Sequence, residues 1–385
     1  MGSAPRFAAA VLTGLLLAQG TFTASAHGRD ADTTPPPPTP RSEVHTLRFL
    51  PGGTDVFHAD TETFSMLGVT WDDPNAPLPG TLEVRTRSVD TDEWSEWTPL
   101  DADDSAGDAE ARRGGTDPLW VGASDGAEVR SIDGDDIVHG LPEGLRLDLI
   151  DPGRATTARP LPAPQASSGT SPAAGAPKPA IVTRAGWGAD ESISPASPVY
   201  TASGAIKAAV VHHTVDSNNY TCAQAPSVIR SIHAYHVRQL GWRDIGYNFL
   251  VDKCGTIYEG RKGGVDRAVL GAHAYGFNSQ TTGIAVLGTY TSTTPPEAVL
   301  NSVAAVAAWK LGKYGIDPTG TTTLTAGADG GNYFHKNWKL GAKLTFPTIH
   351  GHRDGYNTQC PGDKLYDKLP TIRTKAATLT AKNHL

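Results

Sequence analysis

Histidines in two separate stretches and one cysteine are the side chains best suited to binding a metal ion. His212 and His213 directly follow the apolar run 208–211, whereas His352 and Cys360 lie close together near the end of the chain. Imidazole nitrogen and thiolate sulfur are strong zinc ligands, and three protein ligands with one open position are typical of a catalytic zinc site. Isolated histidines often satisfy only local hydrogen bonds, so the spacing alone leaves both interpretations open.

Strand periodicity limits how the paired histidines can act. Successive side chains of a strand point to opposite faces, so only one of His212 and His213 can reach a common metal, and periodicity does not choose between them. His233 and His236 could share a metal on one helix face, but satisfied histidines in a core or groove wall are the simpler interpretation. His350, beside the second stretch, is expected to have a structural role.

The residues after about position 180 show the alternation of strands and helices that positions such ligands. Short apolar runs indicate buried strands, and apolar residues at helical spacing indicate amphipathic helices. A last helix after Asp363 is expected to break at Pro370. We predict strands at 208–211 and 283–288, a hairpin at 247–258, and helices at 225–240 and 295–314. The sequence thus predicts an α/β domain over residues 180–385.

The preceding region has a different pattern. Residues 81–89 alternate apolar or small side chains with charged ones, which is the period of a half-exposed strand. Trp94, Trp97 and Trp120 lie on short segments between turn residues, where they either fill a core or stack on sugar rings. We predict a small all-β domain, a sandwich, over residues 43–151.

Irregular segments precede and follow this β-rich region. Residues 27–42 form a Pro/Thr-rich stub, and residues 152–179 form a linker rich in Pro, Ala, Ser and Gly; both compositions are typical of extended tethers. The formal net charge of −7 argues against nucleic acid as the main partner, because phosphate-binding surfaces need clustered lysine and arginine. Nothing in the sequence indicates more than a monomer.

The first 26 residues have the pattern of an export signal. Arg6 supplies a positive start, residues 7–18 are apolar, and Ala24-Ser25-Ala26 forms a small-residue cleavage site. The apolar run is shorter than the roughly 20 residues that a membrane-spanning helix needs. We therefore expect cleavage and secretion rather than membrane anchoring.

The chain has three cysteines, Cys222, Cys254 and Cys360. An odd number in an exported protein leaves one cysteine that is unpaired, bonded to another chain or bound to a metal. The count alone does not say which cysteine that is.

Five motifs occur in a fixed order between about residues 181 and 369. They are Val210-Val211-His212-His213-Thr214, Gly241-Trp242-Arg243-Asp244-Ile245-Gly246-Tyr247-Asn248-Phe249, Tyr258-Glu259-Gly260-Arg261, Gly271-Ala272-His273 with Asn278, and Gly351-His352-Arg353-Asp354 with Thr358-Gln359-Cys360-Pro361-Gly362. Together they resemble the family of peptidoglycan recognition proteins and zinc N-acetylmuramoyl-L-alanine amidases, which includes the phage-lysozyme-type amidases. The resemblance implies a mixed β-sheet flanked by helices, with a groove for the glycan-linked peptide.

The resemblance also implies a metal site and a disulfide. Carried over residue by residue, the zinc ligands fall on His212, His352 and Cys360. If Cys360 binds zinc, Cys222 and Cys254 remain to form a disulfide, which would tie the loop after His212 to the neighbouring sheet. A bridge of this span contributes roughly 3 kcal/mol to stability in loop-entropy models.

Further residues match functional positions of the family. Tyr247 matches a catalytic tyrosine whose phenol can donate a hydrogen bond to the oxyanion of the reaction. Thr358 matches a position whose hydroxyl can orient the water or the carbonyl. Arg261, His273 and Asn278 match positions that line the peptide groove. No carboxylate stands out at a matched position as the proton donor to the leaving amine.

The function implied by the resemblance is that of a secreted, cell-wall-associated hydrolase. It would use Zn²⁺ to cleave the lactyl amide between N-acetylmuramic acid and L-alanine in peptidoglycan. One alternative is a peptidoglycan-binding protein of the same fold without turnover; such members typically lack the cysteine ligand, so Cys360 favours catalysis. Another is a structural surface protein that uses the β-domain for adhesion and carries a relict amidase domain.

Overall fold

The computed structural model describes residues 41–49, 56–102, 111–134, 136–138, 140–153 and 175–381. The expected export signal lies outside these residues, as do most of the stub at 27–42 and most of the linker at 152–179. Among the described residues, no helix combines the length and apolar character that crossing a membrane requires.

The first part of the described chain folds as a β-sheet. Its strands are β1 (Glu43–Arg48), β2 (Phe57–Trp71), β3 (Thr81–Ser88), β4 (Thr98–Leu100), β5 (Gly114–Gly115), β6 (Leu119–Asp133), β7 (Asp136–Ile137) and β8 (Arg146–Asp151). They pair antiparallel in the order β1-β8-β2-β6-β3-β4, with β5 beside β2 and β7 beside β6. The all-β prediction is confirmed, although the strands join in one continuous sheet rather than in two separately bonded ones.

Alternating side chains of this sheet build its core. On β3, the buried residues Leu82, Val84 and Thr86 alternate with partly exposed ones, as a strand with one covered face requires. The long strands β2 and β6 shift register at irregularities, which bend such strands. Trp120 is buried, whereas Trp94 and Trp97 remain partly exposed. The core includes Phe64, Leu67, Val69, Leu82, Val84, Val129, Leu147 and Leu149.

The second part contains a five-stranded mixed sheet in the order β11-β10-β12-β9-β17. These strands are β9 (Ala208–His213), β10 (Phe249–Val251), β11 (Ile257–Glu259), β12 (Thr281–Val286) and β17 (Ile349–Gly351). All neighbours are parallel except β10 and β11, which form the expected hairpin. Two small antiparallel pairs accompany it: β13 (Thr321–Thr325) with β16 (Lys343–Pro347), and β14 (Gly330–Gly331) with β15 (Asn337–Trp338).

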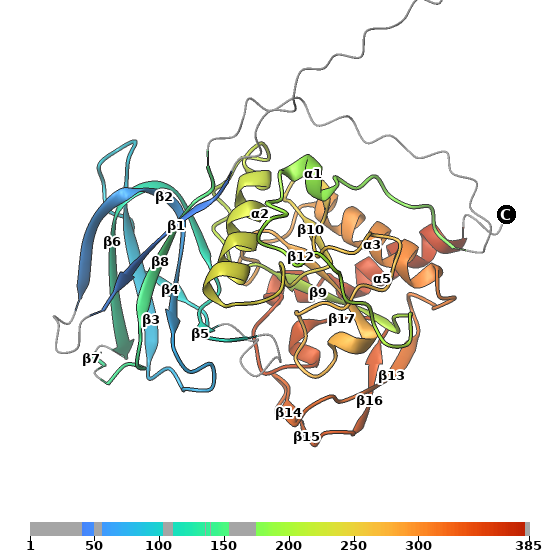
Figure 1. The fold of residues 1–385 in the computed structure, drawn as a ribbon. Coiled ribbons are helices and arrows are strands. Elements are labelled where there is room, and N and C mark those ends of the chain that lie inside the picture. Colours follow the sequence, from blue (N-terminus) through green and yellow to red (C-terminus); the bar gives the residue numbers. More distant parts are fainter. Residues whose placement is uncertain are drawn as a thin grey trace, which may run out of the picture. The chain divides into compact units, whose positions relative to one another are not determined.

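Helices flank the mixed sheet, as the resemblance implied (Figure 1). The helices α3 (Glu297–Gly312) and α5 (Leu369–Ala381) share a core with Val211 and Phe249 of the sheet. The helix α2 (Ala225–Ala234) packs instead with Leu250, whose side chain faces the other way on β10. The short helices are α1 (Arg184–Trp187) and α4 (Asp363–Tyr366), a π-helical turn follows α2 at Tyr235–Gln239, and 3₁₀ turns occupy Asn278–Gln280 and His352–Asp354.

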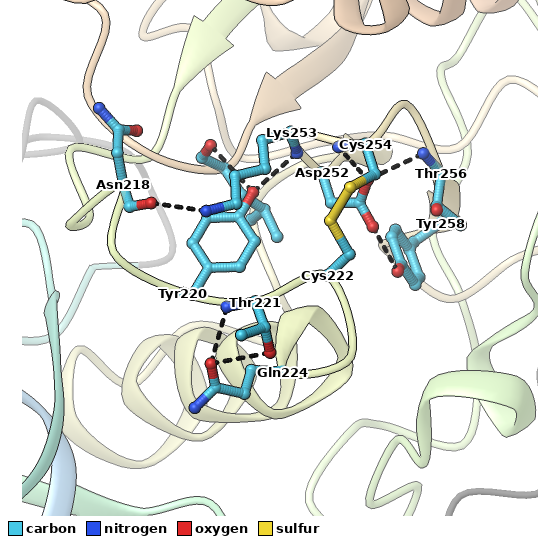
Figure 2. Close-up of a disulfide and its surroundings, with 11 residues drawn as sticks. Asn218, Tyr220, Thr221, Cys222, Gln224, Asp252, Lys253, Cys254, Thr256 and Tyr258 are labelled. Carbon is cyan, nitrogen blue, oxygen red and sulfur yellow. Dashed lines mark hydrogen bonds between the residues drawn. A yellow bond between two sulfur atoms is a disulfide. The ribbon is translucent and has the colours of Figure 1, made fainter.

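A disulfide joins Cys222, just before α2, to Cys254 in the turn between β10 and β11 (Figure 2). The turn is ordered by Asp252, whose carboxylate accepts hydrogen bonds from the backbone N–H groups of Cys254 and Thr256, both at 2.9 Å. The Tyr258 hydroxyl donates to the same carboxylate at 2.8 Å. The structure therefore contains the disulfide expected from the resemblance, and Cys360 is not part of it.

Buried side chains of the first sheet and of the α2 region meet in one cluster. Met66 and Trp120 pack in the same core as Tyr235. The Tyr235 hydroxyl donates to the carbonyl oxygen of Thr116 at 2.9 Å, and the backbone N–H of Trp120 donates to Asp216 Oδ1 at 2.9 Å. Because these contacts bury polar groups from both regions, experiments on this protein are best made with the full chain.

Candidate functional site

Two neighbouring parallel strands position the two histidines of the candidate metal site. β9 ends with His212 and His213, and β17 is followed at once by His352. The register places Val211 opposite Gly351, so the next residue of each strand brings His212 beside His352. Their ring centroids are 4.5 Å apart. In open α/β sheets the carboxyl ends of parallel strands are the usual place for a ligand.

The loop after β17 brings Cys360 back to the same strand ends. The backbone N–H of Arg353 donates to the carbonyl oxygen of Cys360 at 2.9 Å, which closes the loop that starts at His352. The cysteine is 7% exposed, and its Sγ lies 3.7 Å from His212 Nδ1. One donor atom from each of His212, His352 and Cys360 lies within 4.8 Å of the others. The structure thus brings together the three side chains that the resemblance had singled out.

This donor set fits a zinc ion. A nitrogen and a sulfur bound to a tetrahedral zinc, at about 2.05 and 2.3 Å from the metal, are about 3.6 Å apart. The separation of His212 Nδ1 and Cys360 Sγ is 3.7 Å. Two imidazoles and a thiolate also leave one of four positions open, which a catalytic site needs for water and substrate.

His213 faces the opposite side of β9. Val211 packs against the core of α3 and α5, and strand alternation places His213 on that same side. Its Nδ1 accepts a hydrogen bond from the backbone N–H of Tyr290 at 3.2 Å. Burial lowers the pKa of His213 to about 3, so the ring stays neutral and keeps this acceptor. Of the two adjacent histidines, His212 is the one that faces the candidate site.

Burial also keeps the imidazoles around the site neutral. It lowers the pKa of His352 and of His273 to about 3 and that of His212 well below its usual value. Neighbouring imidazoles add to this effect, and the Arg261 charge contributes at His273. Zinc binds neutral imidazole, so the histidines need not lose a proton at neutral pH before binding a metal.

His273, expected to line the peptide groove, contacts His212. The Nδ1 atom of His273 lies 3.1 Å from His212 Nε2. Because His212 turns its other nitrogen toward Cys360, its Nε2–H can donate to His273, the kind of contact that fixes the ring of a metal-binding histidine. Asn278 Oδ1 accepts hydrogen bonds from the backbone N–H groups of His273 and Ala274, at 2.8 and 2.9 Å. Asn278 therefore holds the loop that presents His273.

Tyr247 and Thr358 lie next to candidate ligands, whereas Arg261 lies near His273. The Tyr247 ring is partly exposed, and its centroid lies 5.4 Å from that of His212. Thr358 Oγ1 accepts a hydrogen bond from the backbone N–H of Cys360 at 3.0 Å, which leaves its own proton for donation. Arg261 is buried, and its backbone N–H donates to the carbonyl oxygen of Tyr247 at 2.8 Å. A tyrosine and an aliphatic hydroxyl thus lie next to candidate ligands, and a cation lies near His273, which contacts one of them.

A buried ionic network, which the sequence analysis missed, supports the segment that carries Tyr247. The Asp244 carboxylate lies 3.0 Å from His233 Nε2 and 3.3 Å from an Arg184 guanidinium nitrogen, and it accepts the backbone N–H of Lys262 at 2.8 Å. Burial alone would raise the pKa of Asp244, but the His233 hydrogen bond and the Arg184 charge outweigh it and lower the pKa. Asp244 lies beside Arg243 in the sequence, and nothing in this motif indicated that its carboxylate would be buried.

His236 supports the same segment from the end of the α2 region. Its Nδ1 accepts a hydrogen bond from the backbone N–H of Gly246 at 3.1 Å, and its ring centroid is 6.0 Å from that of Tyr247. Burial lowers the pKa of His236 to about 3, with smaller contributions from nearby positive charge. Protonation would also remove the acceptor that Gly246 uses. His236 is thus a satisfied buried histidine, as the sequence analysis had preferred.

We expect His236 to make the protein less stable as the pH falls below 6.5. Its pKa is about 3 in the folded chain and 6.5 in a model compound, so between these values only the unfolded chain takes up this proton. The free energy of unfolding should therefore fall by up to about 1.4 kcal/mol per pH unit because of this group. Urea unfolding curves measured between pH 7 and pH 5 should show that the free energy of unfolding falls less steeply with pH in His236→Gln than in the wild type.

The matched control is His335→Asn, which removes an exposed imidazole in a left-handed backbone conformation that asparagine tolerates. The free energy of unfolding of this variant should depend on pH in the same way as that of the wild type. If His236→Gln and the wild type lose stability in parallel, His236 does not take part in the pH dependence.

Two family models match the chain. The model described as N-acetylmuramoyl-L-alanine amidase matches residues 202–363, which include His212, His352 and Cys360. The model described as Rv3811 N-terminal galactose-binding domain-like matches residues 27–172, which include the first sheet.

The second part of the chain is similar to known animal proteins. Peptidoglycan-recognition protein SC1a/b of Drosophila simulans is 31% identical over 161 residues, which are 42% of this chain and 70% of that protein. An N-acetylmuramoyl-L-alanine amidase of Homo sapiens is 33% identical over 165 residues, 42% of this chain and 23% of that protein. Among solved structures, wild-type Drosophila PGRP-LB is 26% identical and covers 50% of this chain and 92% of its own, with a TM-score of 0.38.

Proposed function

The chain belongs to the family of peptidoglycan recognition proteins and N-acetylmuramoyl-L-alanine amidases, and from this we propose that it is a secreted, zinc-dependent N-acetylmuramoyl-L-alanine amidase. The proposed reaction is hydrolysis of the lactyl amide between N-acetylmuramic acid and L-alanine in peptidoglycan. The similar proteins include one named as an amidase and others named as recognition proteins. Turnover is therefore the part of the proposal that needs support from the site.

One observation carries the proposal of catalysis: three buried donor atoms, from His212, His352 and Cys360, converge within 4.8 Å. The other two cysteines are paired in a disulfide, so Cys360 is the cysteine that can serve as a metal ligand. Two imidazoles and a thiolate on one side of a buried site are a donor set that zinc prefers. A protein that only recognises peptidoglycan needs a groove but not this donor set.

When bound, zinc would polarise the amide carbonyl and lower the pKa of a water molecule to about 7. The carbonyl oxygen gains negative charge as the amide is attacked, and the Tyr247 phenol is the donor near the ligands that can stabilise this charge. The Thr358 hydroxyl, fixed by the backbone N–H of Cys360, can orient the attacking water. His273 keeps the His212 ring in place through their contact.

Substrate binding is proposed for the residues that follow the hairpin and precede β12. Arg261 carries a buried positive charge close to His273, where it could pair with a carboxylate of the stem peptide. His273 and Asn278 form the adjoining loop, which the backbone hydrogen bonds to Asn278 keep in one shape.

We also propose secretion and an accessory role for residues 43–151. The first 26 residues have the composition of a cleaved export signal, and a disulfide suits an oxidising compartment. In this proposal the accessory domain precedes the linker at 152–179 and the amidase domain at 180–385. A monomer is the expected unit, because each chain contains all the proposed ligands.

Removal of zinc tests the function directly. The purified full chain should contain about one zinc per molecule and release peptides with free L-alanine amino termini from defined muropeptides, as read by mass spectrometry. A chelator should abolish the release, and added Zn²⁺ should restore it. A zinc-loaded chain that binds the muropeptides without releasing peptide would instead be a recognition protein.

A further inference from the structure

We propose that the outer face of β3 and β6 is a glycan-binding platform built on Trp94 and Trp97, and that its ligand is the uncharged amino-sugar backbone of peptidoglycan. The identity of this polymer rests on the proposed function. The platform itself lies in the β-sheet of residues 43–151 and uses none of the side chains of the candidate metal site.

Both indoles contact Arg85 on this face of the sheet. The Arg85 guanidinium is 5.3 Å from the Trp94 ring centroid and 4.9 Å from the Trp97 ring centroid, so one side chain is shared by both rings. Gly126 on β6 makes room for Trp94, because a Cβ there would come within 3.2 Å of the indole. Trp94 also reaches His58 of β2, with ring centroids 5.7 Å apart. Its indole therefore extends across three strands.

Both rings are held in place by side chains that are themselves fixed. Arg130 lies over the Trp97 ring, 4.2 Å from its centroid, and is paired with Glu83 at 2.6 Å. Arg85 is paired with Glu128 at 2.5 Å. Only 16% of the Glu83 side chain and 13% of the Glu128 side chain are exposed, so the carboxylates sit deep in the face. Because the rings are already held in place, a ligand that stacks on them pays little conformational entropy for ordering side chains.

Every guanidinium group on this face is paired with a carboxylate. The third arginine, Arg87, is paired with Asp125 at 2.8 Å and with Asp60 at 3.0 Å. Because the carboxylates outnumber the guanidinium groups, the face has no excess positive charge that would attract a polyanion. It does offer fixed hydrogen-bond donors and acceptors next to aromatic surface. Those features suit an uncharged, hydroxyl-rich ring better than an acidic peptide.

A sugar backbone has the matching chemistry. Pyranose rings present apolar C–H groups that pack on aromatic faces, while their hydroxyl and acetamido groups hydrogen-bond at the edges. In intact peptidoglycan the lactyl carboxyl group is consumed in the amide bond, so the glycan backbone carries no charge. The buried Trp120 shows how this sheet places a tryptophan that only fills its core; Trp94 and Trp97 remain partly exposed.

Protection from oxidation tests the site in the unmodified full chain. A mild tryptophan oxidant is applied with and without a soluble hexamer of β-1,4-linked N-acetylglucosamine, and each tryptophan is followed by peptide mass spectrometry. At a hexamer concentration of about ten times Kd, oxidation of Trp94 and Trp97 should slow about tenfold, because only the free protein reacts. Trp338, partly exposed on β15, is the internal control and should react at the same rate in both arms.

Substitution gives a second, independent measurement. The double variant Trp94→Ala/Trp97→Ala should bind the hexamer about tenfold or more weakly, because both stacking surfaces are lost. Trp94→Phe/Trp97→Phe should recover part of this loss, whereas Trp338→Ala should bind like the wild type. If the alanine variant does not fold, the oxidation experiment on the wild type still decides the question. Equal protection of all three tryptophans, or protection of none, would show that the two indoles only brace the sheet.

The two proposals fail in different ways. Hydrolysis of a defined muropeptide by the wild-type chain, without protection of Trp94 and Trp97 by the hexamer, would overturn the platform alone. Protection of both indoles in a chain that does not hydrolyse muropeptides would keep the platform and overturn the amidase. Protection by a polyanion such as heparin in place of the hexamer would point to an electrostatic partner and contradict a glycan site.

Discussion

Replacing Cys360 with serine is expected to remove zinc from the protein and to abolish hydrolysis of peptidoglycan. The thiolate is one of three proposed ligands, and its Sγ lies 3.7 Å from the nearest proposed ligand atom of His212. Loss of a supporting group around a metal already costs 10- to 100-fold in affinity, and loss of a ligand should cost more than about 100-fold. Metal analysis after dialysis and release of L-alanine amino termini are the two measurements.

The matched control removes the other two cysteines. Cys222→Ser/Cys254→Ser deletes the disulfide but keeps Cys360, so it should retain zinc even though its melting temperature falls. Cys360→Ser should still bind peptidoglycan to some extent, because the groove residues are unchanged. A Cys360→Ser protein with one zinc per chain and near-normal turnover would rule out this cysteine as a ligand.

Replacing Tyr247 with phenylalanine should lower kcat by about 10²- to 10³-fold, the usual effect of deleting one oxyanion donor. The phenol is proposed to act mainly in the transition state, so KM should change little. The ring itself remains and keeps its place beside His212, with the centroids 5.4 Å apart. Zinc content should therefore stay at the wild-type level. Steady-state kinetics on a soluble muropeptide measures both constants.

Tyr314→Phe is the control for loss of a phenol elsewhere in the same domain. Tyr314 is only partly buried and packs against the core of α3 and α5, away from the proposed ligands. Its replacement should leave both kinetic constants near the wild type. A Tyr247→Phe enzyme with normal kcat and a raised KM would mean that Tyr247 positions the substrate and does not stabilise the oxyanion.

The choice between His212 and His213 shows what the sequence could and could not predict. Alternation along a strand required one of them to face away, but the pattern did not say which face would be covered by helices. The packing of Val211 against α3 and α5 decides this, because it puts His213 on the helix side. Such a decision depends on contacts between distant segments, which a local pattern does not contain.

Helix ends were predicted less well than helices. The pattern at 225–240 predicted one helix, but α2 ends at Ala234 and a π-helical turn follows, in which the Leu240 N–H donates to the Tyr235 carbonyl oxygen at 3.1 Å. A π-turn adds one residue to a helical turn, and the apolar spacing at 225–240 did not show where that residue is added. The expected break at Pro370 is present, because the helical run after Asp363 is interrupted between α4 and α5 and Pro370 lies in the first turn of α5, where its missing N–H costs nothing.

The supporting contacts of the site were largely invisible to the sequence. Asp244 and His233 belong to segments whose apolar and charged residues gave no sign that they would meet Arg184 in a buried network. The contact between His273 and His212 likewise joins the loop before β12 to the end of β9. Side chains that bind a metal are recognisable by their chemistry, whereas side chains that hold such residues in place can be of almost any polar type.

The order of the strands has a consequence for when the protein becomes active. β17 is the last strand of the described residues, but it docks beside β9, so His212 meets the other two proposed ligands, His352 and Cys360, only after nearly all of the domain has been made. A partly synthesised chain, or one threaded unfolded through an export channel, would lack two of its three proposed ligands at the strand end. In the proposed function, hydrolysis would therefore begin only once folding of the domain is complete.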